Sequence, residues 1–167
     1  TGRFSLSPEQ ALLFADEDSE FCMLGSFQAA AANLVDMPKV LAAFRSGEGV
    51  GWHEHSACLF RGVERFFRTA YNAHLVQDWL PALDGVVERL RAGAKVADVG
   101  CGRGSSVIIM AQHFPASQFY GFDYHAESIE AARQAAADAG VAGNTTFEVA
   151  AAKNYPGHDY DLIAHFD

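Results

Sequence analysis

Residues 96–106 form an apolar run that breaks into three closely spaced glycines and then continues in a helical pattern. This stretch constrains the fold more than any other, because a strand, a glycine turn and a helix N-terminus follow one another directly. Glycines let the backbone turn sharply and let a ligand approach where a Cβ would collide. We therefore expect the loop to bind a ligand.

The spacing of these glycines departs from the commonest nucleotide-binding loop. Gly100, Gly102 and Gly104 give the pattern G-x-G-x-G, whereas the loops that bind nicotinamide and flavin dinucleotides read G-x-G-x-x-G. Asp98 stands in the strand that leads into the loop. A carboxylate there would repel a pyrophosphate but attract an ammonium group. The pattern therefore favours a ligand with an ammonium group.

A second strand, expected over residues 118–122, ends at the acidic residue Asp123. The acid-bearing glycine loop, its helix and this acid-ended strand closely resemble motif I and the following strand of the class I S-adenosylmethionine-dependent methyltransferases. The resemblance implies an α/β fold with a Rossmann-like, doubly wound parallel sheet. It also implies S-adenosylmethionine as cofactor, S-adenosylhomocysteine as product, and methyl transfer to a small-molecule acceptor.

The resemblance assigns roles to residues at matching positions. Asp98 would face the ammonium end of the cofactor, and Asp123 would accept hydrogen bonds from both ribose hydroxyls. Many members of the family carry an acid after the third strand that contacts the adenine, and this chain has no acid there. The adenine could still be held by the backbone of Ala151 and Ala152, with Asn154 or Lys153 at its edge. The implied cofactor-binding residues are Tyr71, Asp98, Gly100, Cys101, Gly102, Gly104, Asp123, Tyr124, Ala151 and Ala152.

Alternating strand and helix patterns from residue 93 onward predict the first half of the cofactor-binding domain, ending after a fourth strand at 160–165. Residues 1–92 are expected to form a mostly helical region before it. Thr1–Phe14 is similar to the tail of a winged-helix domain, which would imply a homodimer in the longer protein. On this interpretation the sequence is a fragment of a methyltransferase.

Four helices are expected in the N-terminal region. Ser7 and Pro8 form a helix start, with Ser7 as N-cap. Residues 20–45 have helical spacing and 56–80 form one long helical pattern, while a short helix closes at Gly93. The apolar face expected to pack in the first long helix comprises Phe21, Leu24, Phe27, Ala31, Val40, Leu41 and Phe44.

No catalytic base follows from the residues alone, and the candidates are His53, His55 and Tyr71. His53 and His55 belong to a loop that leads into a helix, could contribute to a metal site, or could cover the substrate pocket. No further ligands stand at metal-binding spacing, so no metal is expected. Tyr71 is either a core aromatic or, by the resemblance, a contact of the cofactor carboxylate.

The chain of 167 residues carries a formal net charge of −9, with only 12 Lys and Arg. This balance weighs against a nucleic-acid substrate, because phosphate-binding surfaces need clustered cations. No apolar run is long enough to span a bilayer and no signal pattern opens the chain, so a cytoplasmic protein is expected. The alternatives are an NAD(P)-dependent oxidoreductase and a cofactor-binding transcriptional regulator.

Overall fold

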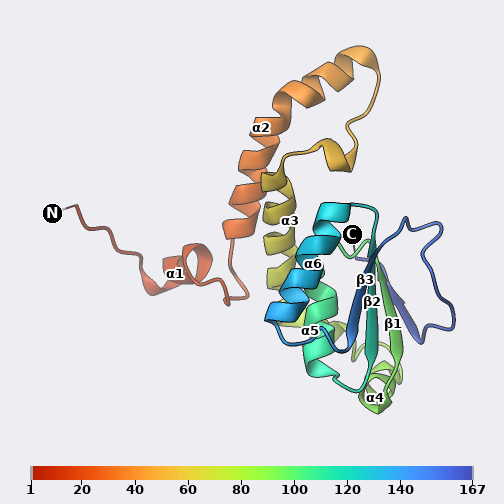
Figure 1. Cartoon of the computed structure of the whole chain (residues 1–167). Helices are drawn as coiled ribbons and strands as arrows, with labels where there is room; N and C mark the ends of the chain where they lie inside the picture. The colour runs from red at the N-terminus through yellow and green to blue at the C-terminus, as the bar shows by residue number, and fades with distance from the viewer. Residues whose placement is uncertain (1, 167) are drawn as a thin grey trace. The chain divides into compact units, whose positions relative to one another are not determined.

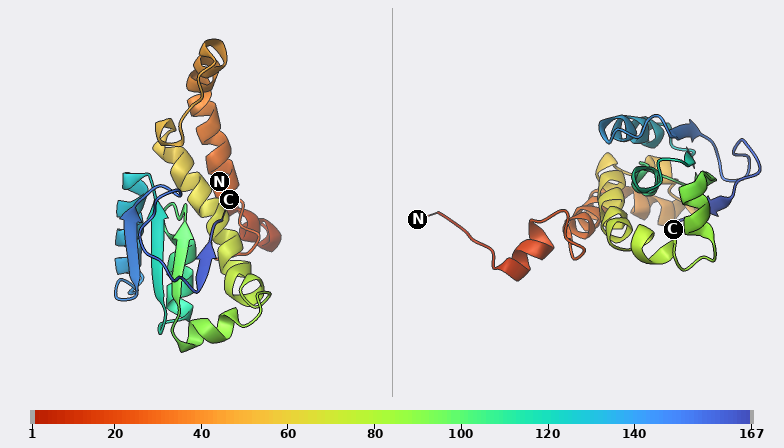
Figure 2. Two further views of the ribbon diagram at one scale, coloured as in Figure 1. Left: turned by 90° about the vertical axis from the view of Figure 1, so that its right-hand side faces the viewer. Right: turned by 90° about the horizontal axis from the view of Figure 1, so that it is seen from below.

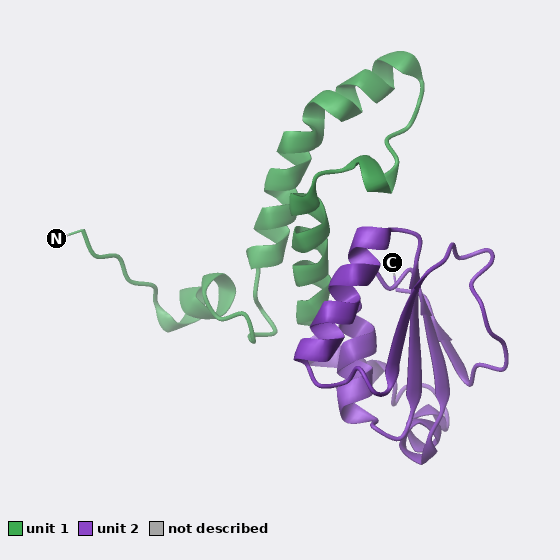
Figure 3. Cartoon of the chain, in the orientation of Figure 1, with its two compact units in different colours: residues 1–70 green, residues 71–167 purple. Residues whose placement is uncertain are grey.

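The computed structural model describes residues 2–166, which divide into two compact units (Figure 3). The first unit extends to Ala70, and the second begins at Tyr71. The boundary after residue 92 that the sequence suggested stays a prediction. Among the described residues, no helix is both long and apolar enough to cross a membrane.

The first unit is helical. It contains α1 (Pro8–Phe14), α2 (Leu24–Ser46), the short 3-10 helix η1 (Trp52–Glu54) and α3 (Ala57–Ala70). The predicted start of α1 is confirmed, because the Ser7 side chain accepts a hydrogen bond from the backbone N–H of Gln10 at 3.3 Å. Residues 2–6 form no strand, so the structure does not show the tail of a winged-helix domain.

Helices α2 and α3 pack against each other through their smallest residues (Figures 1 and 2). A Cβ on Gly25 would lie 2.3 Å from the backbone nitrogen of Phe66, and one on Gly62 would lie 2.6 Å from that of Ala29. Backbones this close leave no room for large side chains. The packing face expected from the sequence is therefore wrong: Phe27 is exposed, and Ala32 is buried instead.

The second unit is an α/β domain. Its elements are η2 (Tyr71–Trp79), α4 (Val86–Ala92), β1 (Lys95–Val99), α5 (Ser105–His113), β2 (Gln118–Asp123), α6 (Ala126–Asp138), β3 (Thr145–Val149) and β4 (Leu162–Ala164). The predicted strands and helices from residue 93 onward are all present. The helical pattern over 56–80 is also present, but from Tyr71 it is a π-helix, with the N–H of Leu80 bonded to Leu75 O at 3.0 Å.

The four strands form one parallel sheet in the order β3-β2-β1-β4. This confirms the partial Rossmann-like fold. The chain proceeds from β1 to β2 and β3 on one side, and then returns to place β4 on the other side of β1. Its topological switch point therefore lies between β1 and β4. In sheets of this kind, ligands bind outside the carboxyl ends of the strands at such a point.

The two faces of the sheet are covered differently. Helices α5 and α6 lie on one face, and the segment between β3 and β4 runs along the other (Figure 1). On that second face, Tyr155 and Tyr160 pack against a cluster formed by Ala97, Val99 and Phe122. Because β1 is covered on both sides, its last four residues are all buried.

Candidate functional site

The glycine loop is joined to the end of the neighbouring strand by backbone hydrogen bonds. The N–H groups of Gly100 and Cys101 both donate to the carbonyl of Phe122, at 2.7 and 3.0 Å. Within the loop, the N–H of Gly104 donates to Cys101 O at 2.9 Å. The predicted ligand loop thus begins where β1 ends and is attached to the carboxyl end of β2.

Two of the loop glycines serve different purposes. A Cβ on Gly104 would lie 2.7 Å from the Phe147 ring and 2.9 Å from the Ala132 side chain, so this glycine permits close packing against α6 and β3. A Cβ on Gly102 would meet no atom within 4 Å. Both residues have positive φ, 81° and 54°. The space over Gly102 is where a ligand can approach the backbone.

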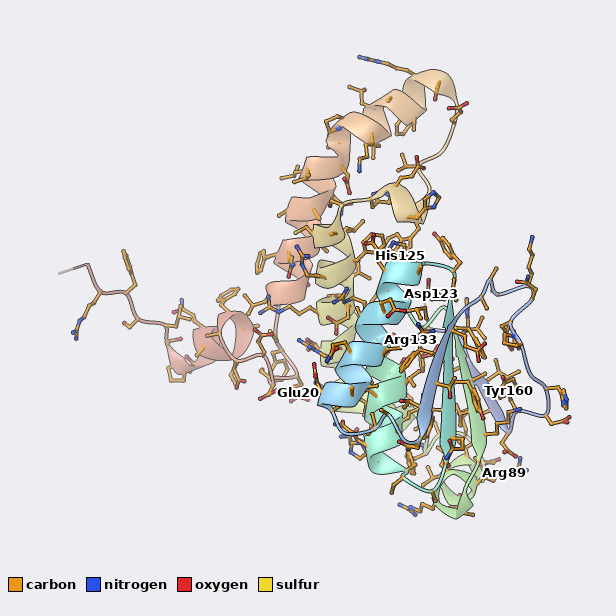
Figure 4. The ribbon with its side chains drawn as sticks, viewed as in Figure 1. Glu20, Arg89, Asp123, His125, Arg133 and Tyr160 are labelled. Carbon is orange, nitrogen blue, oxygen red and sulfur yellow. The ribbon has the colours of Figure 1, made fainter. Side chains whose placement is uncertain are left out.

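Asp123 ends β2 and accepts a hydrogen bond at each carboxylate oxygen. The N–H of Gly102 donates to Oδ2 at 3.0 Å, and the N–H of His125 donates to Oδ1 at 2.8 Å. Figure 4 shows Asp123 and His125 close together where β2 passes into α6. Each oxygen keeps a second lone pair, so the carboxylate can still accept hydrogen bonds from a ligand.

Asp98 is fully buried on the α5 face of the sheet. Ser106, in the first turn of α5, donates a hydrogen bond to Oδ2. Oδ1 is buried and has no hydrogen-bond partner among the described residues. Burial raises the pKa of Asp98 to about 6, against the opposing effect of the Ser106 hydrogen bond. A buried carboxylate oxygen without a partner is costly, and a cationic donor would compensate it.

Tyr71 is buried beside this carboxylate. Burial, and then the charge of Asp98, raise the pKa of Tyr71 to about 12, so the phenol remains protonated. Its ring lies 5.1 Å from that of Phe166 and 6.1 Å from that of Trp79, measured between centroids. The structure therefore brings Tyr71 to the switch point together with Asp98. A protonated phenol there can donate a hydrogen bond, but it cannot serve as a general base at neutral pH.

His165 reaches the same place and was not among the residues expected from the sequence. It follows β4 directly, and its Nδ1 is hydrogen-bonded to the carbonyl of Val99 at the end of β1. Because a carbonyl only accepts, Nδ1 carries the proton, and in the neutral ring Nε2 is then a hydrogen-bond acceptor. The only available signal was a histidine at the end of the last expected strand, 160–165, and its meaning depends on strand order.

The remaining cofactor residues expected from the sequence lie around the loop. Burial raises the pKa of the Cys101 thiol, which keeps it protonated. Tyr124, which is exposed, follows Asp123 in the chain. The backbone N–H of Ala150 donates to Asp123 O at 2.9 Å, which places Ala151 and Ala152 next to the end of β2.

His53 and His55 belong to the first unit, apart from these residues in the chain. The Nδ1 of His55 lies 3.1 Å from Oδ2 of buried Asp36, which also accepts from the N–H of Ser56 at 2.9 Å. The Ser56 hydrogen bond, with smaller contributions from His55 and Lys39, holds the pKa of Asp36 at about 2 despite burial. This arrangement anchors the loop before α3. Within residues 2–166, no three potential ligands gather at a metal-binding distance.

The structure brings together the glycine loop, the unpartnered Oδ1 of Asp98 and the acid that ends β2, and comparison with known proteins shows what this part of the chain is similar to. Residues 90–167 match a family model described as "Methyltransferase domain". Over these residues the chain is similar to a methyltransferase domain, as the resemblance of its motifs implied.

Two curated relatives are similar over part of their length. The trans-aconitate 2-methyltransferase of Streptomyces avermitilis is 31% identical over 91 residues, which cover 54% of this chain and 34% of that protein. The enzyme of the same name from Streptomyces coelicolor is 31% identical over 70 residues, covering 41% and 23%. The chain thus spans about a third or less of the relatives that it matches.

Solved structures give a partial match as well. A methyltransferase from Geobacter sulfurreducens in complex with S-adenosyl-L-homocysteine is 28% identical, with a TM-score of 0.43. The match covers 48% of this chain and 32% of that one.

Proposed function

We propose that this chain is the cofactor-binding part of an enzyme that transfers the methyl group of S-adenosylmethionine to a small-molecule acceptor. The observation that carries the proposal is the unpartnered Oδ1 of Asp98, buried next to a glycine loop whose open side lies over Gly102. When bound, the cofactor supplies a methyl group activated by a sulfonium. The tasks of the protein are then to hold donor and acceptor in line and to exclude water.

The residues of the site suit the parts of this cofactor. Asp98 would bind the ammonium of the methionine part, and Tyr71 would donate to its carboxylate. The loop from Gly100 to Gly104 would lie against the methionine and ribose, while Asp123 would accept from the ribose hydroxyls. Tyr124, Ala151 and Ala152 would border the adenine.

His165 stands where the reactive end of the cofactor is expected, beyond the ends of β1 and β4. We assign it, in place of His53 or His55, as the imidazole that faces the reacting groups. Its Nε2 nitrogen should shift in an NMR titration with S-adenosylhomocysteine, whereas that of His158, in the exposed segment after β3, should not. If the Nε2 signal of His165 does not shift when S-adenosylhomocysteine is added, this placement is excluded.

A small-molecule acceptor is favoured over a nucleic acid for two reasons. The chain has a formal net charge of −9, which opposes phosphate binding. The two curated relatives are named for methylation of trans-aconitate, a small molecule. The proposal thus includes both the small-molecule acceptor and the methyltransferase activity of the whole protein.

A calorimetric titration with two ligands tests the cofactor site. Methylthioadenosine keeps the adenosine of S-adenosylhomocysteine but lacks its amino-acid part. The Asp123→Ala variant should lose affinity for both ligands, because both carry the ribose. The Asp98→Asn variant should lose affinity for S-adenosylhomocysteine only, by about tenfold or more, as expected for a lost charge-assisted hydrogen bond.

Replacement of the exposed carboxyl Asp84 by Asn is the matched control and should change neither affinity. The proposal fails if the folded wild-type protein binds neither ligand. Binding of NAD without S-adenosylhomocysteine would instead support the oxidoreductase alternative.

A further inference from the structure

Helix α2 carries a stripe of large apolar side chains that face solvent. Five of them are between 48% and 83% exposed, which is unusual for one helix face. The stripe, called the α2 seam below, consists of Phe27, Leu34, Met37, Leu41 and Phe44, with the exposed Ala30 between the first two.

The α2 seam is separate from the face that packs on α3. That face contains Gly25, Ala32 and Asp36, which are all buried. Phe27 and Leu34 each follow a buried residue of that face, Gly25 and Ala32, by two positions. At about 100° per residue around the helix axis, they lie about 200° from that face. Phe14 contacts Phe27 at the beginning of the seam, with ring centroids 5.8 Å apart. The hairpin of α2 and α3 therefore does not use the seam.

Spacing identifies the kind of surface that would cover the seam. From Phe27 the residues follow at intervals of three, four, three, four and three positions, which is the a and d pattern of a heptad repeat. This pattern keeps one narrow stripe facing a second helix along its length. Pro38 lies beside the stripe, and the helix continues through it to Ser46. The seam thus fits another helix.

The order of residues along the seam fits an antiparallel copy of itself. In an antiparallel pair, position a packs against position d of the partner. A two-fold axis near the middle of α2 then pairs Phe27 with Phe44, small Ala30 with large Leu41, and Leu34 with Met37. Every residue of the seam has an apolar partner, as a self-complementary two-fold interface requires.

Charge and area also favour a second copy. The positions that flank the seam are uncharged except Arg45, so no like charges meet despite the net charge of −9. With about 200 Å² for each fully exposed large side chain, the five residues expose roughly 600 Å² per chain. This area is as large as the largest apolar patches found on monomeric proteins. It also reaches the lower end of the area that each partner buries in a specific interface, about 600 Å².

We propose that two copies of this chain associate through an antiparallel pair of α2 helices, with the α2 seam of each at the interface. The proposal does not depend on the cofactor site, because every residue that carries it lies in the first unit. It predicts a concentration-dependent dimer in the absence of any ligand.

Sedimentation velocity over a range of concentrations tests the association. The Leu34→Glu variant places a charge at the centre of the seam and should weaken the dimer at least about tenfold. Ala42→Glu adds the same charge to an exposed position of α2 outside the seam and should leave the dimer unchanged. Circular dichroism verifies that both variants remain helical. A wild-type protein that stays monomeric, or equal weakening by both variants, would overturn the proposal.

Disulfide trapping tests the antiparallel geometry. A chain with Phe27→Cys mixed with a chain with Phe44→Cys should give a crosslinked dimer on mild oxidation, while each variant alone should not. Crosslinking of Phe27→Cys with itself, at the level seen in the mixture, would mean a parallel pair and refute the arrangement. Binding of S-adenosylhomocysteine by the same samples reports separately on the cofactor site.

Discussion

Replacing Asp98 by Asn should change how the stability of the protein depends on pH. The carboxyl is buried with one oxygen unpartnered, and its pKa is raised from the ordinary 3.8 to about 6. The folded state therefore binds the proton more tightly than the unfolded state does. Stability is highest while Asp98 is protonated and falls as the pH rises through the range from about 4 to about 6.

The expected size of this effect follows from the two pKa values. One pKa unit corresponds to about 1.4 kcal/mol. Ionisation of Asp98 therefore lowers the free energy of unfolding of the ligand-free protein by about 3 kcal/mol at about pH 7. An Asn side chain has no such titration. Its unpaired N–H would impose a constant penalty, which leaves the pH dependence unaffected.

Urea unfolding of both proteins at several pH values measures the effect. The stability of Asp98→Asn minus that of wild type should increase by about 2.5 kcal/mol between about pH 4 and about pH 7. Titrations common to the two proteins cancel in this difference. The exposed Asp84→Asn variant should show a constant difference. If the Asp98→Asn difference is also constant, Asp98 is not a buried, unpartnered acid and the reasoning is wrong.

Two further predictions concern glycines. Gly104→Ala should lower the free energy of unfolding in urea by about 3 kcal/mol, because its Cβ collides with Phe147 and its φ is positive. Gly102→Ala should lower it by only about 1 kcal/mol, yet abolish S-adenosylhomocysteine binding in calorimetry. Equal stability losses would contradict these separate roles. Gly62→Val should disrupt the packing of α2 on α3 and lower helicity in circular dichroism, since its Cβ would lie 2.6 Å from Ala29 N; an unchanged spectrum would refute this.

The second unit could be predicted largely from sequence because its signals are local. Gly93, Pro115 and Gly140 mark the ends of elements, and the buried strand at Lys95–Val99 has an apolar run that identifies it. The neighbourhood of Asp98, Asp123 and the glycine loop followed from the resemblance. The structure adds how they are joined, above all the contact of Gly102 N–H with Asp123.

Features that depend on distant parts of the chain were missed. His165 reaches the end of β1 only because β4 returns beside β1, and the order of strands in a sheet cannot be read from the local sequence pattern. The packing face of α2 was mistaken because large apolar residues were assumed to be inside. Gly25 and Ala32 are there instead, since close contact with α3 selects small residues. The π-helix from Tyr71 likewise has no signal in the spacing of apolar residues.

The hydrogen bonds of the Asp123 carboxylate should affect the rate and the entropy of ligand binding. Gly102 and His125 are already held by this side chain, so the glycine loop is ordered before any ligand arrives. Ordering a residue on binding would cost about 1–2 kcal/mol of backbone conformational entropy. A site that avoids this cost can bind as a rigid body, so its association rate should depend on encounter and not on loop closure.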